Sequence, residues 1–173
     1  ESPRELMMMN REICSRYAQR FSTASPNMVF SGAPGLGKTF LSACIARTVS
    51  ERGFSVAYDS ATAALGAFER EKFSRDPDET AEAANTVKHY LNCDLMILDD
   101  LGTEMNTAFT QSALYTLINQ RLTAGLPMII STNLTEADLS DRYTPQITSR
   151  LLGEYQWLHF VGTDIRRLKE RYP

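Results

Sequence analysis

The stretch GAPGLGKT at residues 32–39 most constrains the fold of this chain. It follows an apolar run, MVFS, and precedes a helical pattern that extends from about Lys38 to Arg52 and stops at Gly53. A glycine-rich loop between a buried strand and a helix lets backbone N–H groups converge where the positive end of the helix points. This context favours a phosphate-binding loop over a chance Gly/Pro-rich turn.

The stretch also fits the pattern G-x-x-x-x-G-K-[ST]. In such loops the lysine, here Lys38, reaches the β- and γ-phosphates of a nucleotide, and the hydroxyl of Thr39 can ligate Mg²⁺. We therefore expect ATP or ADP with Mg²⁺ as cofactors. The predicted nucleotide-binding residues of this segment are Gly32, Ala33, Pro34, Gly35, Leu36, Gly37, Lys38, Thr39 and Phe40.

Strand patterns alternate with helical patterns along the chain. The predicted strands lie at 28–31, 54–60, 94–100, 126–133 and 156–161, and the predicted helices at 2–21, 38–52, twice between 60 and 93, and at 107–124. Strands separated by helices imply right-handed crossovers, so the sequence predicts an α/β fold with a five-stranded parallel sheet flanked by helices.

The first helix has its own signals. Ser2 and Glu5 have capping-box spacing, with Pro3 at the first helical position. Its predicted apolar face consists of Leu6, Met9, Ile13, Tyr17 and Phe21.

Polar residues close two of the predicted strands. Asp99 closes the hydrophobic run LMILDD, so we expect its carboxylate at the carboxyl edge of the sheet as a partner of Mg²⁺. Asp100 is the candidate that polarises an attacking water, and Glu104 is a weaker candidate for that task. Asn133, in IISTN, is expected to orient the water or contact the γ-phosphate. The alternative for Asp100 and Asn133 is a turn-capping role.

Composition narrows the class of protein. The 173 residues are expected to form one domain, in which 1–25 provide an N-terminal helix and linker. Lys and Arg number 18 against 21 Asp and Glu, so a nucleic-acid site must be a local basic patch on a mildly acidic body. The cysteines Cys14, Cys44 and Cys93 lack metal-site spacing and favour a reduced, cytoplasmic location. No apolar run of about 20 residues is present, so we expect no membrane partner.

The phosphate loop, LMILDDLGTE, STN, ITSRLLG and GTDIRR, in this order, resemble the AAA+ ATPases. More narrowly, they are similar to the DnaC/DnaI helicase loaders and to the related IstB transposition helpers. The resemblance extends from about Tyr17 to Arg167. It implies an AAA+ P-loop core whose ATP hydrolysis is slow and depends on assembly.

The resemblance assigns further roles to single residues. Asp99 and Asp100 match Walker B, Asn133 matches sensor 1, and Arg150 matches the arginine finger that reaches the nucleotide of a neighbouring subunit. Thr144 and Pro145 can start the short helix that carries Arg150. The alternative for Arg150 is a local pair with Glu154 or Asp141, which would be common and weak.

The chain departs from the wider family at two places. Walker B reads Asp-Asp instead of Asp-Glu, so the candidate base is one methylene shorter. Arg166 matches the sensor 2 position, but only residues 167–173 follow, too few for the usual C-terminal lid, which we therefore expect to be absent. The helicase loaders are short at this end, which favours that group.

The resemblance implies a replicative hexameric helicase, single-stranded DNA and further copies of the chain as partners, and a helicase-binding domain upstream of Glu1. In AFEREKFSR, basic residues alternate with Phe68 and Phe73 as in a DNA-stacking surface, although their spacing also suits an ordinary amphipathic helix. The leading hypothesis is the ATPase of a helicase loader. The alternatives are a transposition helper ATPase, a small-molecule kinase and a nucleotide-gated adaptor with negligible turnover.

Overall fold

The computed structural model describes residues 2–164, and its centre is a five-stranded sheet. All of its pairings are parallel, in the order β2-β3-β4-β1-β5. This confirms the predicted sheet. The strands are β1 (Asn27–Ser31), β2 (Val56–Ser60), β3 (Leu95–Leu101), β4 (Met128–Thr132) and β5 (Tyr155–His159).

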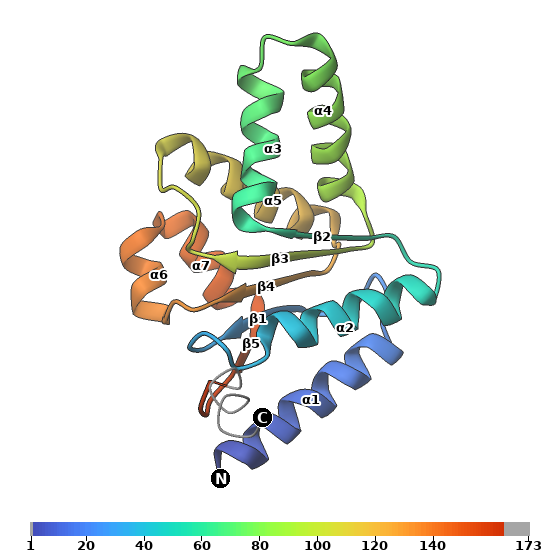
Figure 1. Ribbon diagram of the computed structural model, residues 1–173, viewed down its shortest axis with the longest axis vertical. Helices are drawn as coiled ribbons and strands as arrows, with labels where there is room; N and C mark the ends of the chain where they lie inside the picture. The colour runs from blue at the N-terminus through green and yellow to red at the C-terminus, as the bar shows by residue number, and fades with distance from the viewer. Residues whose placement is uncertain (1, 165–173) are drawn as a thin grey trace, which may run out of the picture.

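Helices cover both faces of the sheet (Figure 1). One hydrophobic cluster joins α1 and α2 to one face, and a larger cluster joins α3 to α7 to the other. No helix within residues 2–164 has the length and apolar character needed to cross a bilayer. The helices are α1 (Pro3–Gln19), α2 (Lys38–Glu51), α3 (Ala61–Phe73), α4 (Pro77–Asn92), α5 (Ala108–Ala124), α6 (Glu136–Arg142) and α7 (Pro145–Gly153).

Helix α1 begins as predicted, but its buried face differs from the predicted one at two positions. The Ser2 and Glu5 side chains form the capping box. Cys14 and Tyr17 are buried against α2, whereas Met9 and Ile13 are 48% and 42% exposed. The predicted apolar face is therefore wrong at these two positions, because the contact with α2 is made through the neighbouring stripe.

Helix α6 was not predicted from the sequence. Its seven residues are too few to show a helical period, although Thr135 and Asp138 form a capping box at its start. Its Leu139 side chain is completely buried in the larger core cluster.

A buried arginine lies where the chain enters β3 and β4. Arg121, in the last turn of α5, has no exposed surface. Its guanidinium donates to the carbonyl oxygens of Tyr90 and Pro127, both at 2.8 Å, and of Asp94 at 3.4 Å. Burial lowers the pKa of Arg121. The guanidinium thus connects the end of α4 to the segments that enter β3 and β4.

Replacing Arg121 by Met should lower the free energy of unfolding by roughly 3 kcal/mol or more, because the hydrogen bonds of a fully buried guanidinium to three backbone carbonyls are lost. Urea unfolding measures the change. The control is Tyr155→Phe, since the buried Tyr155 hydroxyl has no hydrogen-bond partner within residues 2–164. That variant should lose less than about 1 kcal/mol. Equal stability of R121M and the unmodified chain would contradict the proposed role of Arg121.

Candidate active site

The loop between β1 and α2 has the backbone of a phosphate-binding loop. Gly35 and Gly37 adopt positive φ values of 79° and 91°, and Gly37 is the N-cap of α2. This left-handed conformation is accessible to glycine without steric cost. It brings the loop back to the start of α2, where the N–H groups of the first helical turn point toward the site of an anion.

The chain after β5 lies directly against this loop. A Cβ atom at Gly32 would be 2.3 Å from the carbonyl oxygen of Phe160, and one at Gly35 would be 1.9 Å from a carboxylate oxygen of Asp164. Side chains are therefore excluded at both glycines. Sequence reasoning did not identify Asp164 as a neighbour of the loop, because the contact depends on the path of the chain beyond β5. The predicted sensor 2 residue, Arg166, lies outside the described residues.

The side chain of Lys38 is held within the loop. It is only 5% exposed, and its Nζ donates to the carbonyl oxygens of Gly32 at 2.6 Å and Ala33 at 2.7 Å. Its positive charge is thus placed inside the loop backbone.

Thr39 and Asp99 meet at the carboxyl edge of the sheet. The Thr39 hydroxyl lies 3.0 and 3.2 Å from the two carboxylate oxygens of Asp99, which is buried. A hydroxyl and a carboxylate are the hard oxygen ligands that Mg²⁺ uses when substrate phosphates and waters complete its shell. Within residues 2–164, no cluster of three or more His, Cys, Asp and Glu side chains forms another metal site. The donor set therefore fits Mg²⁺ held at a nucleotide.

Asp100 follows Asp99 in an unusual backbone conformation. Its φ of 55° is the only positive value at a non-glycine residue among those described. Burial, and then the charge of Asp99, raise the pKa of Asp100, whereas Lys38 lowers it. A carboxylate with a raised pKa is a better proton acceptor than an ordinary surface aspartate.

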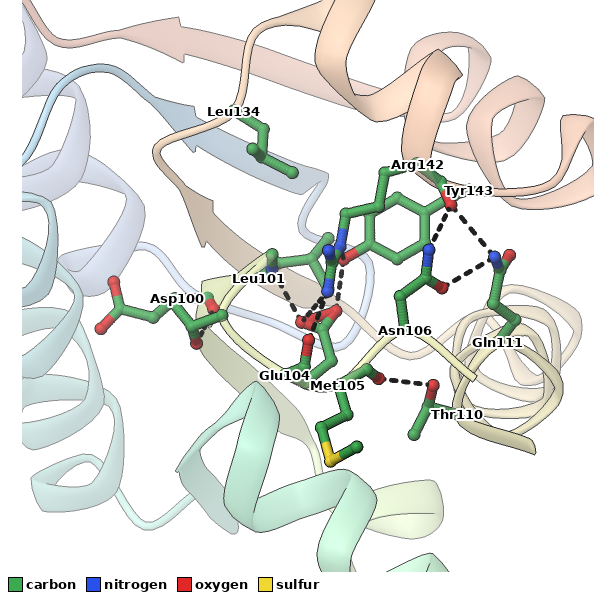
Figure 2. A network of polar contacts seen from close by, with 12 residues as sticks. Asp100, Leu101, Glu104, Met105, Asn106, Thr110, Gln111, Leu134, Arg142 and Tyr143 are labelled. Carbon is green, nitrogen blue, oxygen red and sulfur yellow. Dashed lines mark hydrogen bonds and ion pairs between the residues drawn. The ribbon is translucent and has the colours of Figure 1, made fainter. Parts of the chain in front are cut away.

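Glu104 has a structural environment (Figure 2). It is 6% exposed, and its carboxylate accepts hydrogen bonds from the Gly102 backbone N–H at 2.9 Å and from the Tyr143 hydroxyl. Arg142 lies 3.6 Å from the same carboxylate and donates to the Glu104 carbonyl. Figure 2 shows the Asp100 side chain pointing away from this network. These contacts favour Asp100 over Glu104 as the candidate base.

Asn133 and Arg150 occupy different positions relative to the loop. Asn133 follows the end of β4, is exposed, and makes no side-chain hydrogen bond with any residue of 2–164. Arg150 packs against α5, where Nε donates to the Asn119 amide oxygen at 3.1 Å and Nη2 to the Tyr115 hydroxyl at 3.2 Å. Its guanidinium carbon lies 4.8 Å from the centre of the Tyr115 ring.

The alternative ion pairs of Arg150 with Glu154 or Asp141 do not form within residues 2–164. The hydrogen bonds and ring contact hold the guanidinium on the α5 side of the sheet, and the phosphate loop leads into α2 on the other side. The arrangement leaves the arginine-finger assignment as a prediction about a second subunit.

The two phenylalanines of the basic and aromatic segment in α3 differ in burial. Phe68 is 8% exposed and belongs to the core, as the helical spacing indicates. Phe73 is 61% exposed, and its ring meets that of Phe109 edge to face at 5.0 Å. Lys72 lies 5.9 and 5.7 Å from these two ring centres. Only Phe73 therefore retains a large exposed surface.

A groove of about 650 Å³ lies between α1 and α2 beside the phosphate loop. Met7 and Cys14 line it from α1, Leu36 from the loop, and Phe40 and Cys44 from α2. Its lining is mostly apolar, and it is open to the point where α2 begins.

Ser131 is the functional candidate that sequence reasoning missed. It is completely buried in β4, and its hydroxyl contacts both Asp99 and Asp100. The only sequence signal was its place two residues before Asn133 in STN.

Three curated proteins are similar to the chain in sequence. The chain is 23% identical to the replicative helicase loader DnaC of Escherichia coli K12 over 84% of its own length and 58% of that protein. It is 30% identical to DnaI of Bacillus subtilis over 65% of the chain and 35% of that protein. An insertion-sequence ATP-binding protein of Mycobacterium tuberculosis is 26% identical over 67% of the chain and 44% of that protein. The chain thus spans little more than half of the DnaC relative.

Solved structures share the fold. The crystal structure of the DnaC helicase loader aligns with a TM-score of 0.72 at 20% identity, covering 86% of each chain. AMPPCP-bound DnaA from Aquifex aeolicus aligns with a TM-score of 0.73 at 21% identity, covering 92% of this chain and 49% of that one. These similarities confirm the predicted AAA+ P-loop fold.

The family described as IstB-like ATP binding protein matches residues 7–168. That match includes the phosphate loop, both Walker B aspartates and the strand that precedes Asn133. The chain therefore belongs to the IstB-like ATP-binding protein family.

Proposed function

We propose that the chain is the ATP-binding and ATP-hydrolysing module of a DNA replication helicase loader. The observation that carries this proposal is the convergence of Lys38, Thr39, Asp99 and Asp100 at the carboxyl end of the sheet. They lie beside a loop whose glycines leave no room for a Cβ atom. A site that only bound a phosphate would need the loop and the lysine. The paired carboxylates are what hydrolysis additionally requires.

Each residue has a distinct role in this proposal. Loop N–H groups bind the phosphates, and Lys38 exchanges the carbonyls of Gly32 and Ala33 for phosphate oxygens. Thr39 and Asp99 would hold Mg²⁺, which would neutralise charge on the phosphates. Asp100 accepts the proton of the attacking water, and the Asn133 amide orients that water.

The groove between α1 and α2 fits the base of the nucleotide. It lies beside the first turn of α2, where the α-phosphate of a loop-bound nucleotide would be held. Met7, Leu36 and Phe40 offer apolar surface for a flat purine ring.

The partners follow from the relatives. DnaC and DnaI are replicative helicase loaders, and their matches support a replicative hexameric helicase as the partner of this chain. We further propose ATP-bridged self-assembly and contact with single-stranded DNA, for which exposed Phe73 and neighbouring Lys72 provide a stacking and charged surface.

The insertion-sequence relative favours the second candidate, a transposition helper ATPase. Binding assays with a replicative helicase and with a transposase, each in the presence of ATP and Mg²⁺, distinguish these two functions. Selective retention of the transposase would contradict the loader proposal without affecting the ATPase proposal.

Lys38→Ala should lower the affinity for ATP by at least about tenfold, because the charge that faces the phosphates is removed. Calorimetry with ATP and Mg²⁺ measures the affinity. Lys88→Ala, at an exposed lysine of α4, is the matched control and should bind as the unmodified chain does. Equal affinities of the Lys38 and Lys88 variants would exclude the phosphate-loop interpretation.

Asp100→Asn should leave ATP bound but slow turnover by about 100-fold or more, since an amide cannot accept the proton. Phosphate release at saturating ATP measures turnover. Glu104→Gln is the comparison, and its main effect should be on stability because Glu104 faces Arg142 and Tyr143. Undiminished turnover in the Asp100 variant would contradict its role as the base.

Arg150→Ala should remove turnover while leaving the ATP affinity of the monomer nearly intact, if Arg150 completes a neighbouring site. Mixing this variant with the inactive Lys38→Ala chain should restore some activity, because one mixed pair then contains an intact site. The assay uses high protein concentration and single-stranded DNA to favour assembly. Lost ATP affinity in the Arg150→Ala monomer, without rescue in any mixture, would instead place Arg150 in its own subunit's site.

A further inference from the structure

The pairing of β3 with β4 is interrupted at the two aspartates. The register is regular up to Leu98 and resumes at Leu101 with a shift, so Asp99 and Asp100 together lie opposite the single residue Ser131. This is the two-against-one arrangement of a β-bulge. Such a bulge leaves part of the backbone ladder without its usual partners.

The hydroxyl of Ser131 makes the connection that the ladder lacks. It accepts a hydrogen bond from the backbone N–H of Asp100 at 3.0 Å and donates to the carboxylate of Asp99. Ser131 has no exposed surface, so its hydroxyl does not bind solvent water. One buried hydroxyl therefore holds the backbone of one aspartate and the side chain of the other.

The bulge explains how neighbouring residues can serve one site. In a regular strand, successive side chains point to opposite faces of the sheet. The bulge and the positive φ of Asp100 change this alternation, and Asp100 is close enough to Asp99 and Lys38 for both charges to affect it. The hydrogen bond from the Asp100 N–H to Ser131 helps to maintain this left-handed conformation.

We propose that Ser131 is a positioning residue that holds Asp99 for Mg²⁺ and Asp100 for the attacking water. The inference rests on the proposed ATPase function and adds a residue to its site. Asp99 is then held between two hydroxyls, Thr39 from α2 and Ser131 from β4. Its orientation is set before the metal binds, which lowers the reorganisation needed for binding.

The test compares Ser131→Ala with Thr132→Val. Thr132 is the next residue of β4, is equally buried, and its hydroxyl also makes two hydrogen bonds, but these go to the Leu101 carbonyl and the Leu134 N–H. Both variants remove one buried hydroxyl from the same strand. Only Ser131→Ala removes the hydrogen bonds to the Asp99 carboxylate and the Asp100 N–H.

ATP affinity is measured by calorimetry with and without Mg²⁺, and unfolding is followed thermally. Ser131→Ala should raise the Mg²⁺ concentration needed for half-maximal ATP binding by about tenfold, because a hydrogen bond to a charged group is lost. Its affinity for ATP without Mg²⁺ should stay within about twofold of the unmodified chain, since the loop and Lys38 are untouched. Thr132→Val should melt earlier but keep the normal dependence on Mg²⁺.

Ser131→Cys supplies a second variant of similar size if the alanine chain folds poorly. Its thiol is a weaker hydrogen-bond donor than the serine hydroxyl. The Mg²⁺ dependence should therefore shift in the same direction, but by less than in Ser131→Ala. A Mg²⁺ dependence of the Ser131 variants equal to that of Thr132→Val would overturn the positioning role. Absence of any Mg²⁺-dependent ATP binding by the unmodified chain would overturn the proposed function itself.

Discussion

The parallel pairing of three strands brings the candidate site together. β4 lies between β3 and β1, so residues that leave the carboxyl ends of these strands meet at one edge. Thr39 comes from the helix after β1, Asp99 from β3, and Ser131 from β4 between them. A one-residue shift of β3 or β4 would turn the side chain of Asp99 or Ser131 to the other face of the sheet. Core packing on both faces therefore also maintains the geometry of the site.

The loop after Asp100 connects this edge to α6 and α7. Glu104 is fixed by Arg142 and Tyr143, which lie where α6 ends and the chain turns into α7 (Figure 2). Burial, followed by the hydrogen bond to Glu104, raises the pKa of Tyr143, so its hydroxyl remains a neutral donor. Helix α7 carries Arg150. The loop that follows the candidate base is thus attached to the segment that leads into the helix carrying the predicted intersubunit arginine.

In the proposed function, the two sides of the sheet have different roles. On one side, α1 and α2 form the groove that we assign to the nucleotide base, close to the phosphate loop. On the other side, α3 and α4 form a long helical pair, and α5 to α7 hold Arg150 (Figure 1). Nucleotide contacts and the proposed contacts with DNA and a second subunit are therefore separated by the sheet. The nucleotide site and the proposed partner contacts can influence one another at the carboxyl ends of β3 and β4.

The sequence alone determined the features that depend on neighbouring residues. The glycine loop before α2, the capping box of Ser2 and Glu5, and the hydrophobic run that leads to Asp99 each depend on local backbone preferences or periodicity. For this reason the order of the five strands, the parallel sheet and the P-loop fold were predicted correctly. Tertiary structure decided which face of α1 is buried, the existence of α6 and the burial of Arg121. It also decided the contacts of Arg150 and the position of Asp164 at Gly35. It decided the bulge at Ser131 as well, because a register shift depends on how two strands far apart in the chain pair, which no local pattern encodes.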